Sequence, residues 1–149
     1  MDSLIPIFVD IDVACSSKKK ALAVLAAKAA EALPVDEADL FAALNKREKL
    51  GTTGIGGGVA LPNAVAAGIS TDKTLFLRFS TPVDFDALDD EPIDLLVCHL
   101  SPADALDQDR LRALAKLNNL MSDASTQAYL RGAESRAAVS AILEDRLAV

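Results

Sequence analysis

The sequence KREKLGTTGIGGGVALPNA, residues 46–64, decides how the middle of this chain folds. Its charged start is typical of a helix end, and the loop that follows holds five of the chain's seven glycines. Glycine lets a backbone adopt positive φ and approach other groups closely. The apolar residues after the loop predict a short strand at 58–62 that ends at Pro62. We therefore expect the next side chain, Asn63, to lie beside the loop.

Helix and strand signals extend on both sides of this loop. Two helices are expected upstream of the loop, because apolar residues recur there in steps of three and four. Serine and aspartate are their expected N-caps, and a proline and a glycine mark their expected ends. Residues 64–73 are expected to form a loop. The other expected elements are an edge strand or extended entry segment in 4–13, helices over 18–33 and 37–50, strands at 74–79 and 93–100, a third helical region beginning at Ser101-Pro102, and short helices around 126–131 and after Ser135.

This order of elements predicts an α/β or α+β fold, with a small sheet covered by helices. The length of 149 residues fits one domain, residues 1–149. The formal net charge of −7 argues against nucleic acid as a partner, since phosphate binding needs a basic field. Apolar runs shorter than a bilayer span argue against membrane insertion. Two cysteines without a C-x-x-C pattern favour a cytoplasmic protein with reduced thiols.

The glycine loop has two interpretations. It lacks the lysine of a phosphate-binding P-loop. It also lacks the last glycine of a dinucleotide-binding fingerprint, because Val59 stands at that position. A tight turn from helix to strand therefore explains it without a ligand. The alternative is an anion pocket, because backbone N–H groups of such a loop can nest an anion, with the hydroxyls of Thr52 and Thr53 and the nearby Arg47.

Other polar residues are explained structurally. His99 is the only histidine, and it lies in an apolar strand on the face of Leu95 and Val97, so a packed histidine is favoured over a catalytic one. The acidic residues at 84–91 miss the spacing of a calcium loop and indicate a solvated turn. We expect neither a metal site nor a cofactor. Arg110 stands out, because a cation near a helix start opposes the helix dipole.

The central stretch strongly resembles the active-site segment of phosphotransferase-system enzyme IIA domains of the mannitol/fructose type, and within them the nitrogen-regulatory proteins. Their pattern reads R-E-x-x-G-S-T-G-[IV]-G-x-G-[IV]-A-[IV]-P-H-[GA]. The segments SSKKKAL, TPVDFDALDDEPIDLL and LVCHLSPAD extend the resemblance to essentially the whole chain. The residues that match the pattern or substitute conservatively are Arg47, Glu48, Gly51, Thr52, Thr53, Gly54, Ile55, Gly56, Gly58, Val59, Ala60, Leu61, Pro62 and Ala64.

The resemblance implies a mixed sheet flanked by helices, and a histidine after the proline that takes a phosphoryl group from a phosphorylated carrier protein. Here that position is Asn63. A carboxamide nitrogen, whose lone pair is delocalised into the carbonyl, forms no phosphoramidate. Arg110 matches the position of a second histidine present in many members, whereas Arg47 and Thr53 are retained as groups that can hold an anion.

The resemblance leaves two functions open. The first is a regulatory protein-binding module of the phosphotransferase system that has lost the transfer step. Its partners would be the phosphocarrier protein and regulatory targets such as a transport regulator or a kinase. The second is an active phosphocarrier of the sugar or nitrogen system, seen as an acceptor-site variant. Arg110 favours a natural variant over a single engineered substitution, since both histidine positions have changed.

Overall fold

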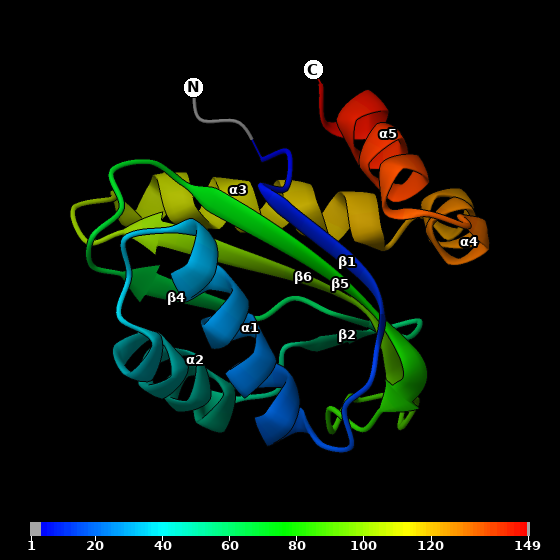
Figure 1. The fold of residues 1–149 in the computed structure, drawn as a ribbon, viewed down its shortest axis with the longest axis horizontal. Helices are drawn as coiled ribbons and strands as arrows, with labels where there is room; N and C mark the ends of the chain where they lie inside the picture. Colours follow the sequence, from blue (N-terminus) through cyan, green and yellow to red (C-terminus); the bar gives the residue numbers. More distant parts are fainter. Residues whose placement is uncertain (1–3, 149) are drawn as a thin grey trace.

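Residues 4–148, the part of the chain that the computed structural model describes, fold into five helices and a six-stranded sheet (Figure 1). The helices are α1 (Lys18–Ala32), α2 (Glu37–Leu50), α3 (Asp107–Met121), α4 (Ala124–Gly132) and α5 (Arg136–Leu147). The strands are β1 (Phe8–Val13), β2 (Gly54–Gly56), β3 (Val59–Ala60), β4 (Asn63–Ala66), β5 (Lys73–Val83) and β6 (Ile93–Pro102). The predicted fold class, a small mixed sheet covered by helices, is confirmed.

The sheet is organised around β6, which has strands on both sides. Its main order is β1-β5-β6-β3-β2. Strand β5 is antiparallel to β6, whereas β3 and β4 are parallel to it. These last two strands pair with successive parts of β6, since Val59 lies opposite Leu95 and Asn63 lies opposite His99. The chain between them, Leu61-Pro62, interrupts what would otherwise be one continuous strand.

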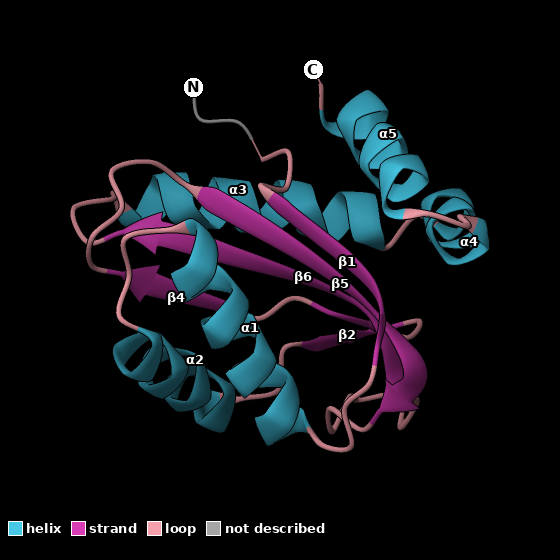
Figure 2. Ribbon diagram, in the orientation of Figure 1, coloured by secondary structure: helices cyan, strands magenta, loops and turns pink. Residues whose placement is uncertain are grey.

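Helices cover both faces of the sheet (Figure 2). Alternate residues of β5 and β6 point to opposite faces, as the pleat of a strand requires. On one face Leu75 and Leu96 pack in a core with buried residues of α1 and α2. On the other, Phe76 and Leu95 pack with buried residues of α3, α4 and α5. The sheet therefore lies between two helical layers.

The predicted caps of the first two helices are confirmed. The Ser17 hydroxyl accepts a hydrogen bond from the N–H of Lys20 at 3.2 Å, and the Asp36 carboxylate accepts one from Asp39 N–H at 2.9 Å. Helix α2 ends at Leu50, followed by Gly51, as expected. At this C-terminal end Gly51 N–H donates to the Glu48 carbonyl oxygen at 3.2 Å, and the glycine loop begins here.

Several boundaries differ from the sequence prediction. Strand β5 runs on to Val83, where it pairs with Ile93 of β6, and does not stop at 79. Residues 64–66 form strand β4 rather than a loop, because β6 extends far enough to pair with them. For the same reason Ser101-Pro102 ends β6 and does not begin a helix, and α3 starts only at Asp107. Within the glycine loop, Gly54–Gly56 forms the short strand β2 against β3. In each case strand pairing overrides the local turn signal, with the distant β6 for β4 and with the adjacent β3 for β2.

The N-terminal apolar run becomes the edge strand β1, parallel to β5, and starts at Phe8, after Pro6. Among residues 4–148, no helix has both the length and the apolar character needed to cross a membrane.

Gly68 fixes the turn at the end of β4 and gives a test of the fold. Its φ is +99°, and a Cβ there would meet the carbonyl oxygen of Pro34 well inside van der Waals contact. We predict that Gly68→Ala lowers the free energy of unfolding by about 2 kcal/mol or more. The matched control is Gly132→Ala, since Gly132 has open space around its Cα. Urea denaturation of both variants measures the difference, and equal stabilities would contradict the prediction.

Candidate functional site

The four residues singled out from the sequence lie around two adjoining hollows between α2, β4 and α3. Arg47 in the last turn of α2, Asn63 at the start of β4 and Arg110 in the first turn of α3 line a hollow of about 490 Å³. Arg47 and Asn63 also line a second hollow of about 370 Å³, together with Thr53. The structure thus brings together residues from three elements widely separated in sequence.

Asn63 is half-buried, and its carboxamide is oriented by the strand interruption next to it. Its Nδ2 donates a hydrogen bond to the carbonyl oxygen of Leu61 at 3.1 Å. This contact occupies one N–H of the side-chain amide. The remaining N–H and the carbonyl oxygen can donate and accept hydrogen bonds, but neither is a nucleophile at neutral pH. The side chain at the centre of the site is therefore suited to recognition.

Cationic side chains surround Asn63, although the chain as a whole is acidic. Arg47 donates to the carbonyl oxygen of Gly51 at 2.9 Å, which keeps its guanidinium near the glycine loop. Arg110 pairs with Asp107 at 2.6 Å, and its side chain is 30% exposed. Lys46 lines the larger hollow as well. The local excess of positive charge favours an anionic group on whatever binds here.

Thr53 is held by a buried carboxylate that the sequence analysis missed. Its N–H and its hydroxyl donate to the two oxygens of Glu48, at 2.9 and 2.5 Å. The Glu48 side chain is only 4% exposed and also pairs with Lys18 at 3.1 Å. Because both donors of Thr53 are bound inside the protein, an anion in the hollow would be held by Arg47 rather than by Thr53. The sequence feature that could have predicted this contact is the position of Glu48 near a helix end, five residues before Thr53.

The glycine loop is likewise closed by internal partners. Gly57 N–H donates to the Asp89 carboxylate at 3.0 Å, and Gly54 N–H donates to the Thr52 hydroxyl at 3.0 Å. On the other side, Arg131 donates to the Gly57 carbonyl oxygen at 2.6 Å. The N–H groups of Gly54 and Gly57 therefore already have internal acceptors and are not free for an external anion. The acidic residues at 84–91 are exposed, as expected of a solvated turn, and one of them, Asp89, also holds the loop.

His99 is fully buried on the face of the sheet beneath α3, as the strand alternation predicted. Its Nε2 lies 3.7 Å from an Asp72 oxygen, too far for a hydrogen bond. Within the described residues neither ring nitrogen has a hydrogen-bond partner. Burial lowers the pKa of His99 below its ordinary value, and nearby Arg110 lowers the pKa further, against the opposing effect of Asp72. The imidazole is thus neutral near pH 7.

The comparison with known proteins agrees with this architecture. Residues 4–146 match the family described as "Phosphoenolpyruvate-dependent sugar phosphotransferase system, EIIA 2". The chain has the fold of the mannitol IIA protein from Escherichia coli, whose crystal structure superimposes with a TM-score of 0.75 at 19% identity. The chain belongs to this EIIA family.

Relatives named as nitrogen regulatory proteins are similar over most of their length. The one from Bradyrhizobium diazoefficiens is 40% identical over 128 residues, covering 86% of this chain and 83% of the relative. The one from Escherichia coli is 36% identical over 136 residues, with 88% and 80% covered. The crystal structure of nitrogen regulatory protein IIA-Ntr from Neisseria meningitidis superimposes with a TM-score of 0.84 at 35% identity, covering 91% of this chain and 92% of that one.

The Glu48 carboxylate gives a test of how the loop is held. We predict that Glu48→Gln lowers the free energy of unfolding by about 2 kcal/mol, because the amide cannot accept from Thr53 and pair with Lys18 as the carboxylate does. The control is Lys49→Gln on an exposed neighbour, expected to change stability by less than about 0.5 kcal/mol. Urea denaturation compares the variants. Equal effects would show that the buried network contributes nothing specific.

His99 gives a prediction about pH. A histidine whose pKa is lower in the folded state leaves the folded protein less protonated than the unfolded chain. Its contribution to stability is therefore complete above about pH 6.5 and is lost as the pH falls toward the lowered value. We predict that wild type loses stability between about pH 6.5 and pH 5 relative to His99→Leu, with a slope of up to about 1.4 kcal/mol per pH unit. Thermal melts across this range measure it, and parallel curves for the two proteins would refute it.

Proposed function

We propose that this chain is a regulatory protein-binding member of the phosphotransferase system in which Asn63 occupies the phospho-acceptor position. It keeps the nitrogen-regulatory IIA scaffold but accepts no phosphoryl group. It would thus act on its partners as a IIA protein fixed in the unphosphorylated state. The partners that this function implies are the phosphocarrier protein of the system and a regulatory target such as a transport regulator or a kinase.

The observation that carries the proposal is the chemistry at position 63. The site has a half-buried carboxamide where phosphoryl transfer needs a nucleophilic nitrogen. No other imidazole can substitute, because the chain's single histidine, His99, has no exposed surface. Arg110 occupies the position of the second histidine and pairs with Asp107. Both changes remove nucleophilic or proton-carrying groups from the site and leave charge recognition.

The surroundings of Asn63 support a retained binding role. The hollow in front of it is rimmed by Leu50 and Leu111, which are 81% and 64% exposed, and by cationic side chains. Large exposed apolar residues beside charged ones are typical of protein interaction sites. A partner protein with apolar and acidic groups at its contact surface would match this site.

The alternative function is an active phosphocarrier, of which this chain is an acceptor-site variant. The contacts that hold the glycine loop favour this alternative. Arg47 holds Gly51, Glu48 holds Thr53, and the Thr53 carbonyl oxygen accepts from Leu61 N–H at 2.8 Å, two residues before position 63. Under this alternative the scaffold would need only an imidazole at position 63 to transfer phosphate.

Labelled phosphoenolpyruvate, with the phosphorylated carrier protein of the system, separates the two functions. We predict that wild type takes up no acid-labile label, because a carboxamide forms no phosphoramidate. Asn63→His and the matched control Asn63→Gln are tested beside it. Label on Asn63→His alone would mean that the scaffold remains competent and that Asn63 ended transfer. No label on either variant would mean that Arg110 and other changes have also inactivated the site. Stable label on wild type would overturn the proposed function.

A further inference from the structure

The outer edge of β4 is open. Within residues 4–148, β4 pairs only with β6. The carbonyl oxygen of Pro62 accepts from His99 N–H at 3.0 Å, so the peptide groups of alternate residues from Pro62 onward face β6. The N–H and C=O groups of Asn63 and Val65 therefore point away from it. An unpaired row of such groups is a template for another strand.

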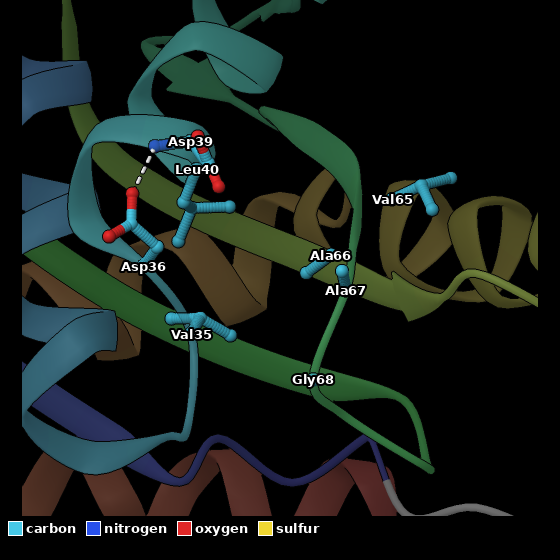
Figure 3. Close-up of a pocket in the computed structure, with 8 residues that line it drawn as sticks. All are labelled: Val35, Asp36, Asp39, Leu40, Val65, Ala66, Ala67 and Gly68. Carbon is cyan, nitrogen blue, oxygen red and sulfur yellow. Dashed lines mark hydrogen bonds between the residues drawn. The ribbon is translucent and has the colours of Figure 1, made fainter.

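Two hollows adjoin this edge and meet at Val65. One, of about 410 Å³, lies between the start of α2 and residues Val65–Gly68. Figure 3 shows Ala66 on the side of Leu40 and Val65 pointing away from it. The other is the hollow of about 490 Å³ that contains Asn63 and the second half of α2. Val65 is 41% exposed, so a side chain of an added strand would find an apolar contact at the centre of the edge.

One continuous face of α2 borders both hollows. Its members recur in steps of three and four, as residues on one side of a helix do. They are Asp36, Asp39, Leu40, Ala43, Lys46, Arg47 and Leu50, the first of which caps the helix. The helix rises about 21 Å over its length, and the strand stretch 63–68 spans roughly 17 Å. A segment lying along β4 would therefore contact α2 over most of its length.

Charge divides this groove into two ends. At the Gly68 end are the carboxylates of Asp36 and Asp39, both on exposed residues. At the Asn63 end are Lys46, Arg47 and Arg110. An extended chain along the edge would place one end against carboxylates and the other against cations. The groove thus selects for both the charge and the direction of what it binds.

We propose that the open edge of β4 binds an extended peptide segment of a partner protein as an added strand. The segment has a basic residue at the Asp36 and Asp39 end, an acidic residue at the Lys46, Arg47 and Arg110 end, and apolar residues between them. Main-chain hydrogen bonds to Asn63 and Val65 hold it, and the two hollows receive its side chains. The peptide proposal specifies how the proposed regulatory module would bind its partner. It rests on the proposed function, because both require the chain to be a binding module.

The probes are two capped synthetic peptides, Lys-Val-Thr-Val-Thr-Glu for antiparallel and Glu-Thr-Val-Thr-Val-Lys for parallel addition. Both are titrated into the full chain labelled with ¹⁵N. We expect one of them to shift the amide resonances of residues 63–67 and to give cross-strand contacts to Val65. The same peptide with N-methylated backbone amides is the control, and it should not bind. Absence of site-specific shifts with both peptides would overturn the proposal.

Two pairs of variants separate strand addition from other binding. Val65→Pro removes an outward N–H and no bond to β6, so we expect at least tenfold weaker binding with the fold retained. Val65→Thr keeps the N–H but loses part of the apolar contact, so we expect it to bind only about two- to threefold more weakly than wild type. Lys46→Glu should weaken the preferred peptide severalfold, and exchanging the peptide's glutamate for lysine should restore the affinity. Equal binding by Val65→Pro and Val65→Thr, with both folded, would refute pairing at the edge.

Sedimentation of the chain alone tests a second copy as the occupant. Dimers that disappear in Val65→Pro would mean that the edge pairs with itself, which would overturn the peptide proposal. The titration uses no phosphorylated carrier, so its failure leaves the proposed function standing. Conversely, label on the wild-type chain in the transfer assay would refute the proposed function without affecting the peptide result.

Discussion

The buried carboxylate of Glu48 is the constraint on which the site depends. A carboxylate that is only 4% exposed must be paired and hydrogen-bonded, since burying an unpaired charge costs several kcal/mol or more. Its partners are Thr53 in the glycine loop and Lys18 at the start of α1. Lys18 in turn pairs with Asp86 in the acidic turn. One charged group therefore joins two helices, the loop and the turn, and fixes the end of α2 that presents Arg47.

The second determinant is the division of one sheet position between β3 and β4. Both strands pair with β6, and the interruption at Leu61-Pro62 turns the Asn63 side chain to the Leu61 carbonyl. It also leaves β4 without a neighbour on its outer side in the described residues, because β2 pairs only with β3. The same local geometry thus places Asn63 among cations and leaves the edge of β4 open.

Charge distribution explains how an acidic protein can attract an anionic partner group. The net charge is −7, but many carboxylates are paired or cap N–H groups. Asp89 accepts a hydrogen bond from the glycine loop, and Asp123 caps α4. Lys46, Arg47 and Arg110 meet at one hollow because α2 and α3 converge there. The total charge argues against nucleic acid as a partner, whereas the local field governs recognition at short range.

The sequence alone determined the helices, the glycine loop, the family resemblance and the residue that follows Pro62, Asn63. These follow from local signals, namely caps, the 3.6-residue period and a motif read residue by residue. It also determined that His99 is buried, since alternation along a strand is local. The tertiary structure decided the rest. Strand β4, the late start of α3 and the short β2 depend on pairing with β6 or β3, and the role of Glu48 depends on Thr53 and Lys18 coming close in space. β4 and β6, like Lys18 and Glu48, lie far apart in the chain, whereas β2 and β3, like Glu48 and Thr53, are close in sequence. In both cases only the packed fold brings the hydrogen-bonding groups within reach of each other.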